Sequence, residues 1–168
     1  HPVAHSFPTR RSSDLVTHIT AGLRPFLRFD RQPLTDLDVA NAQPLLLAAA
    51  LRNPALCATY VANAQHSAGS DPAGAVLEAL RAVPEREVEE YARLCESGLF
   101  YEALLNASGA RSREDVKRAV YRDVFFGKLQ QRGPVTEAFE SLWPGIYGGL
   151  CRLKADCGYK MVARVLQR

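Results

Sequence analysis

The sequence has no long apolar run and little net charge. Its longest apolar stretch, residues 44–51, spans eight residues, far fewer than the roughly 20 that an α-helix needs to cross a bilayer. The N-terminus lacks the charged start and apolar segment of a secretory signal. The formal charge of +3 is too small to identify a nucleic-acid-binding protein by itself. These absences predict a cytoplasmic protein with no membrane partner.

Cysteine is also scarce, and its spacing excludes two kinds of site. The four cysteines, at positions 57, 95, 151 and 157, match neither a disulfide framework nor the paired Cys-x-x-Cys spacing of a zinc site. We interpret them as small, buried apolar residues. The remaining composition, 47% hydrophobic and 23% charged, is typical of a globular chain that folds as a monomer around one core.

The first fourteen residues are not predicted to belong to the fold. Residues 6–14 read Ser-Phe-Pro-Thr-Arg-Arg-Ser-Ser-Asp, which resembles the conceptual translation of a common sequencing-library adapter. A segment of that origin would be a disordered artefact, so the fold is predicted for residues 15–168 alone. The alternative is a basic, serine-rich flexible arm that contacts phosphate.

A short strand and a series of helices are predicted for the rest of the chain. Residues 34–39 alternate in polarity, which places Asp36 and Asp38 on one strand face. Two carboxylates there suit a cation site or, alternatively, a solvated strand end. Helix start and stop signals predict helices over residues 45–51, 55–64, 73–83, 84–96, 99–106, 112–128, 135–143, 145–155 and 159–167. The predicted fold class is therefore α+β, predominantly helical.

The helix over 112–128 carries the most informative pattern, two stripes of side chains at four-residue spacing. One stripe is Arg113, Lys117, Tyr121 and Phe125, and the other is Val116, Val120 and Val124. The valines are the predicted core face, which leaves two cations and two aromatic rings along one edge. Cations bind phosphates and rings stack on bases, so this edge suits a polyanion that carries bases. An amphipathic helix with snorkelling arginine and lysine side chains would show the same spacing.

The register of this helix resembles motif B of the family A DNA polymerases, the group that contains bacterial DNA polymerase I. That motif reads Arg-x3-Lys-x3-Phe/Tyr-x3-Tyr-Gly. The resemblance implies that Arg113 and Lys117 hold the incoming triphosphate and that Tyr121 packs on the nucleotide sugar or base. Phe125 would lie on the template side, although the sequence here is Phe125-Phe126-Gly127 where the family has Tyr-Gly.

Residues 37–43, Leu-Asp-Val-Ala-Asn-Ala-Gln, resemble motif A of the same family, Asp-Tyr-Ser-Gln-x-Glu. By this resemblance Asp38 is catalytic and binds two Mg²⁺ ions with help from the main-chain carbonyl of Val39. Two such ions stabilise the attacking and leaving oxygens of a phosphoryl transfer. Gln43 stands where the family has a glutamate that excludes the ribose 2′-hydroxyl.

Two further matches keep the family's order along the chain. Phe139-x3-Trp143-Pro144-Gly145-Ile146 resembles the Phe-x3-Tyr-Pro-Gly-Val that follows motif B. Residues 98–101, Gly-Leu-Phe-Tyr, stand where many members have Gly-x-Asp-Ile-His. The sequence contains no His-Asp pair, the signature of motif C. The chain is therefore predicted to end before the second catalytic carboxylate and to be inactive by itself.

The resemblance implies a division of the chain and a function. Residues 15–52 would be part of a palm, 53–110 a helical insertion or connection, and 111–168 helices like those of the fingers. The chain would be a fragment of a phage-like, template-directed DNA polymerase. Its partners would be primer–template DNA and a deoxynucleoside triphosphate, with Mg²⁺ assisting nucleotide transfer to the primer 3′ end. The alternative is a non-catalytic helical module that binds nucleic acid or protein, in which Asp38 is a turn residue.

Overall fold

The computed structural model describes residues 26, 28–33, 41–64, 72–128, 132–158 and 162. The chain divides into two compact units, His1–Val39 and Ala40–Arg168. The predictions for the first fourteen residues, for the strand over 34–39 and for most of the helix over 159–167 lie outside the described residues.

A small hairpin is the described part of the first unit. Strand β1 (Arg28–Phe29) pairs antiparallel with strand β2 (Gln32–Pro33). The two residues between them, Asp30 and Arg31, both have positive φ, 48° and 64°. Positive φ at both positions gives a two-residue turn the twist that matches its strands.

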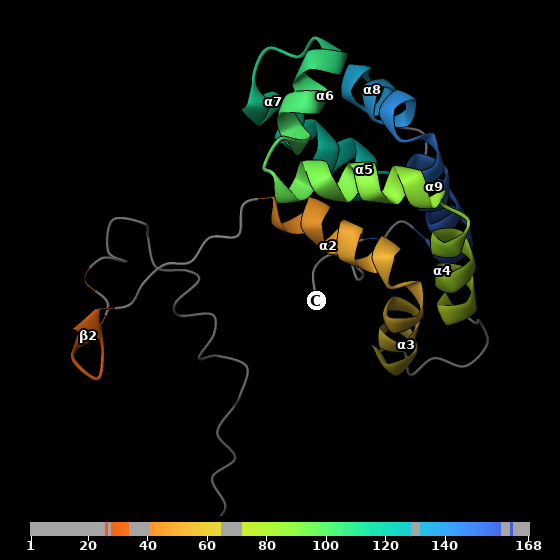
Figure 1. The fold of residues 1–168 in the computed structure, drawn as a ribbon, viewed down its shortest axis with the longest axis horizontal. Coiled ribbons are helices and arrows are strands. Elements are labelled where there is room, and N and C mark those ends of the chain that lie inside the picture. The colour runs from red at the N-terminus through yellow and green to blue at the C-terminus, as the bar shows by residue number, and fades with distance from the viewer. Residues whose placement is uncertain are drawn as a thin grey trace, which may run out of the picture. The chain divides into compact units, whose positions relative to one another are not determined.

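The second unit is a helical assembly (Figure 1). Its elements are α2 (Ala42–Arg52), α3 (Pro54–Ala64), α4 (Pro72–Arg81), α5 (Glu85–Glu96), α6 (Phe100–Ser108), α7 (Arg113–Ala119), the π-helical turn η2 (Val120–Phe125), α8 (Pro134–Leu142) and α9 (Pro144–Cys157). Helix α5 packs along α2, α3 packs on α4, α4 on α9, and α6 on α8. No helix in the described parts of the chain is long and apolar enough to cross a membrane.

The predicted α+β fold class is wrong. In the second unit every described element is helical. The hairpin of the first unit, with two residues in each strand, is the only β-structure among the described residues. Local propensity explains the excess of helix, because alanine and leucine, the best helix formers, make up most of the segment that becomes α2. Asn41, in the left-handed conformation at φ 59°, marks where that helix begins.

The predicted helices of the second unit are confirmed where they are described, with ends displaced by up to three residues. Gly98 and Gly109 have positive φ, 78° and 65°, just beyond α5 and α6. Left-handed residues stop helices there, and glycine adopts that conformation without a Cβ penalty. The exception is the helix over 112–128, whose second half is the π-helical turn η2.

Aromatic side chains from α5, α6 and α8 form the centre of the core. Phe100 stacks on Trp143 with ring centroids 5.5 Å apart, and Tyr91 and Phe139 contact both rings edge-on. All four are almost completely buried. Burial of each large apolar side chain contributes about 1.5–3 kcal/mol to folding, so this cluster is a principal source of stability for the second unit.

The cysteines are all free thiols. Cys95 lies in the core, as predicted, and burial raises its pKa to about 12. The other three, Cys57, Cys151 and Cys157, are half-buried and pack against the core. The prediction of buried apolar cysteines is therefore confirmed for Cys95 and only partly for the rest.

The Trp143-Pro144-Gly145 segment forms the corner between α8 and α9. Glu87 of α5 accepts hydrogen bonds from the backbone N–H groups of Gly145, at 3.1 Å, and Ile146, at 2.6 Å. A carboxylate at this position satisfies helix N–H groups that have no partner within the helix. Gly145 approaches α5 so closely that an added Cβ would lie 2.6 Å from Cδ of Pro84. The glycine is therefore required by packing.

Candidate functional site

The start of α7 is fixed by a cap at Ser112. The Ser112 hydroxyl oxygen accepts a hydrogen bond from the backbone N–H of Asp115 at 3.1 Å, and the hydroxyl donates to the Asp115 carboxylate at 2.9 Å. That bond and the Arg118 guanidinium lower the pKa of the Asp115 carboxyl. A negative charge in the first turn is favourable to a helix. The predicted helix start is thus confirmed.

The three valines of the helix form its core face, as predicted. Val116, Val120 and Val124 are completely buried. The stripe of Arg113, Lys117, Tyr121 and Phe125 does not stay on one face, because the π-helical turn η2 begins at Val120. In this turn the N–H of Phe126 donates to the carbonyl of Tyr121, five residues earlier, at 2.9 Å.

The π-helical turn places Phe125 in the core and leaves Tyr121 at the surface. Phe125 is completely buried and contacts Phe139, with ring centroids 6.4 Å apart. Tyr121 is half-buried. The predicted edge of two cations and two aromatic rings therefore contains Arg113, Lys117 and Tyr121 but not Phe125.

Arg113 lies against α6. Its Nε donates to Oε1 of Glu102 at 2.9 Å, and its guanidinium carbon lies 5.0 Å from the ring centroid of Tyr101. Both terminal nitrogens of Arg113 remain without a hydrogen bond to any described residue. The side chain is 41% exposed, so its terminal nitrogens can reach a ligand while Nε holds the arginine in place.

Tyr121 and Gln43 join the two predicted motifs. The Tyr121 hydroxyl donates a hydrogen bond to Oε1 of Gln43, which lies in the first turn of α2, 78 positions earlier in the chain. Tyr101 lies beside this pair. Burial raises the pKa of the Tyr101 phenol, and the neighbouring Tyr121 adds to the rise. Tyr121 and Arg113 therefore lie next to one buried tyrosine, Tyr101, and Gln43 is bonded to Tyr121.

A shallow apolar groove lies beside Tyr121. It has a volume of about 460 Å³ and is lined by Lys117, Arg118, Tyr121, Arg122 and Phe126. The rings of Tyr121 and Phe126 have centroids 5.8 Å apart. Lys117 is exposed, and its ammonium makes no hydrogen bond or ion pair with a described residue. An ammonium group is thus available to a phosphate at the edge of an aromatic surface.

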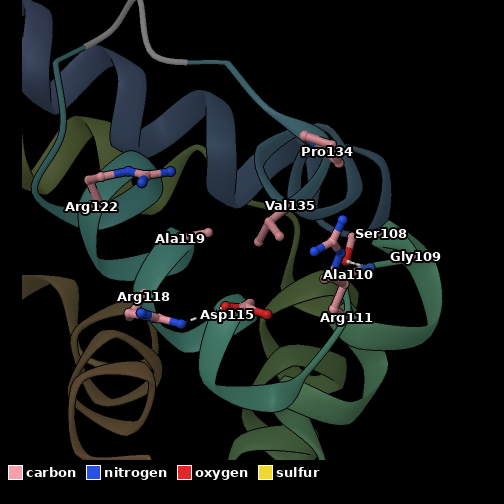
Figure 2. Close-up of a pocket in the computed structure, with 10 residues that line it drawn as sticks. All are labelled: Ser108, Gly109, Ala110, Arg111, Asp115, Arg118, Ala119, Arg122, Pro134 and Val135. Atoms are coloured by element: carbon pink, nitrogen blue, oxygen red, sulfur yellow. Dashed lines mark hydrogen bonds and ion pairs between the residues drawn. The ribbon is translucent and has the colours of Figure 1, made fainter.

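A second pocket, of about 550 Å³, shares Arg118 and Arg122 with this groove (Figure 2). Its walls come from the turn between α6 and α7, from α7 itself, from η2 and from the start of α8. Arg111 and Asp115 also line it. None of these arginines was among the site residues predicted from the sequence. The available signal was the excess of basic residues, seven against three acidic ones, within residues 111–132.

The predicted metal ligands, Asp38 and Val39, lie outside the described residues. Within the described parts of the chain there is no group of three His, Cys, Asp or Glu side chains that would hold a metal ion.

Comparison with known proteins gives no relative, because no protein-family model, curated protein or solved structure matches the chain. The function is therefore inferred from the geometry of Lys117, Tyr121, Gln43 and Arg113 and from the two hollows beside them.

Proposed function

We propose that the chain is the nucleotide-binding part of a template-directed DNA polymerase of family A. The hydrogen bond between Tyr121 and Gln43 is the observation that carries this proposal. The resemblance assigns Tyr121, in the motif B helix, to the sugar or base of the incoming nucleotide, and Gln43, in motif A, to the position that faces the ribose 2′-hydroxyl. Both assignments concern one nucleotide, so the contact between the two side chains supports the proposal.

The chemistry of the neighbouring side chains suits a triphosphate. Lys117 is an unpaired, exposed ammonium, and Arg113 offers two terminal nitrogens. Guanidinium and ammonium groups make the strongest hydrogen bonds to phosphate oxygens. The Tyr121 ring forms the wall against which a sugar or base packs, and its bond to Gln43 fixes the ring's orientation.

The proposed reaction is the transfer of a nucleotide to a primer 3′-hydroxyl with release of pyrophosphate. Lys117 and Arg113 would hold the triphosphate, and Tyr121 would orient the nucleoside. Mg²⁺, held by Asp38 and the carbonyl of Val39, would neutralise charge on the reacting phosphate. No primer extension is expected from this chain alone, because only one metal-binding carboxylate has been assigned.

Binding of deoxyadenosine triphosphate tests the proposal. We expect Lys117→Ala to weaken binding roughly tenfold, the effect of one charge-assisted contact. The matched control is Lys128→Ala, which removes an exposed lysine that does not line the groove. Isothermal titration calorimetry gives the affinities, and circular dichroism checks the fold. Equal affinities for the two variants and the wild type would contradict the proposal.

The second candidate is a non-catalytic helical module that binds nucleic acid or protein. It is favoured by the surface ion pairs of the basic residues, Arg113 with Glu102 and Arg118 with Asp115. Such pairs are typical of a solvated helix face. This candidate predicts no measurable affinity for the triphosphate in the presence of Mg²⁺, whereas the polymerase proposal predicts an affinity that depends on Lys117.

A further inference from the structure

Three arginines line the second pocket, and none of them is assigned to the phosphates in the proposed triphosphate site. Arg111 comes from the turn before α7, Arg118 from the body of α7, and Arg122 from η2. Figure 2 shows Arg111 and Arg118 on the two sides of Asp115, with Arg122 farther along the helix. Three separate segments thus bring guanidinium groups to one hollow.

The charge of the pocket is positive. Asp115 is the single acidic residue in its lining, and Asp123 pairs with Arg122 beside it, so three guanidinium groups stand against two carboxylates. The remaining lining is small or apolar and includes Val135 and Pro134 at the start of α8. Gly133 provides no side-chain cap for that helix, so the positive end of α8 adds to the attraction for an anion.

The existing ion pairs leave the arginines free to bind a ligand. Arg118 contacts Asp115 through Nη2 at 2.6 Å, and Arg122 contacts Asp123 through Nε and Nη2 at 2.7 Å. Arg111 makes no hydrogen bond or ion pair with a described residue. Arg118 and Arg122 are 75% and 71% exposed, and exposed pairs contribute little. Each guanidinium has five N–H donors, so donors remain on all three.

The adjoining groove indicates what kind of anion would bind. The pocket and the groove share Arg118 and Arg122, and the groove presents the rings of Tyr121 and Phe126. An aromatic surface next to a cationic hollow is the arrangement with which proteins bind single strands, since rings stack on bases and cations hold the backbone. We propose that Arg111, Arg118 and Arg122 bind a backbone phosphate of a single-stranded nucleic acid whose adjacent base packs on Tyr121 and Phe126. This inference rests on the proposed function in one respect: both place a base in the groove beside Tyr121.

The test is the affinity of the whole chain for a fluorescent single-stranded oligodeoxynucleotide of about 12 nucleotides, within the range of single-strand site sizes. The variants are Arg111→Gln and the double variant Arg118→Gln/Arg122→Gln. Arg81→Gln, an exposed arginine on α4 outside both hollows, is the matched control. We expect each arginine lost to weaken binding roughly tenfold and to reduce the slope of log affinity against log salt by about one.

Two results would overturn the proposal. One is an oligonucleotide affinity in the pocket variants equal to that of Arg81→Gln, with the fold checked by circular dichroism. The other is inorganic phosphate displacing the oligonucleotide at equal phosphate concentration, because the pocket would then select a free anion rather than a strand.

The same variants separate this inference from the proposed function. Triphosphate affinity should be retained by Arg111→Gln and weakened roughly tenfold by Lys117→Ala. If the wild type binds no triphosphate but its oligonucleotide binding depends on the three arginines, the proposed function fails and the strand site stands. If triphosphate binding depends on Lys117 and oligonucleotide binding ignores the arginines, the strand site fails alone.

Discussion

The hydroxyl of Tyr121 donates a hydrogen bond to the side-chain oxygen of Gln43 across 78 positions of sequence. This bond connects the π-helical turn η2 to the first turn of α2, two elements that local sequence alone would not bring together. It also occupies the polar end of Tyr121, so the ring can present its face to the groove that Lys117 borders.

Removing the Tyr121 hydroxyl should destabilise the fold slightly and leave the groove intact. Tyr121→Phe keeps the ring and loses the bond, so we expect the free energy of unfolding in urea to fall by about 1 kcal/mol. Gln43→Ala should cost a similar amount, and the double variant should cost less than the sum of the two. Full additivity of the two substitutions would mean that the side chains do not interact.

The corner at Gly145 offers a sharper test of packing. A Cβ at this position would lie 2.6 Å from Cδ of Pro84 and 2.9 Å from Oε2 of Glu87. We therefore expect Gly145→Ala to lower the free energy of unfolding by about 1–3 kcal/mol, as overpacking does. Thermal unfolding monitored by circular dichroism would measure the change.

Gly148→Ala is the matched control for Gly145→Ala. It lies in the same helix, α9, and an added Cβ would meet nothing within 4 Å. Alanine is a better helix former than glycine, so this variant should gain about 0.5–1 kcal/mol. An equal change in the free energy of unfolding for the two substitutions would show that Pro84 and Glu87 leave room for a Cβ at Gly145.

Lys154 should give the chain a measurable pH dependence. Its ammonium is buried and donates to the carbonyl of Val124 in η2 at 2.6 Å. Burial lowers the pKa of Lys154 below its ordinary value of 10.5. Between the lowered pKa and 10.5 the unfolded chain binds more protons than the folded one, so this residue makes stability rise with pH in that window.

Lys154→Met removes the titrating group and keeps an unbranched side chain. The stability of the wild type minus that of the variant should therefore increase as the pH is raised toward 10.5, measured by urea unfolding at a series of pH values. Taking the difference cancels the titration of tyrosines and cysteines common to both proteins. A constant difference across the series would show that the pKa of Lys154 is not lowered.

Local signals predicted most of the helical unit. Gly98, Gly109 and Ser112 act on their own neighbours, through left-handed backbone or a side-chain cap, so their effect can be read without knowledge of the fold. The predicted α+β class was wrong. It followed from an expected strand over 34–39, which lies outside the described residues, whereas the helix formers of segments such as α2 make the second unit helical.

The candidate site was less accessible to prediction. The stripe from Arg113 to Phe125 assumed uniform α-helical spacing, and the π-helical turn breaks that assumption. The resemblance assigned Tyr121 and Gln43 to one nucleotide, but their hydrogen bond was not predicted, because it depends on how α2 packs. The arginine pocket was not predicted either, because it depends on tertiary packing: the first turn of α8 completes its wall.

The π-helical turn also decides how many rings the groove contains. Tyr121 and Phe126 are five residues apart, and in an α-helix such residues point about 140° away from each other. In a π-helical turn they are joined by a backbone hydrogen bond, here at 2.9 Å, and the centroids of their rings are 5.8 Å apart. An α-helix over the same residues would therefore turn the second ring off this face. The double-ringed groove thus depends on the π-helical turn as much as on the identity of its residues.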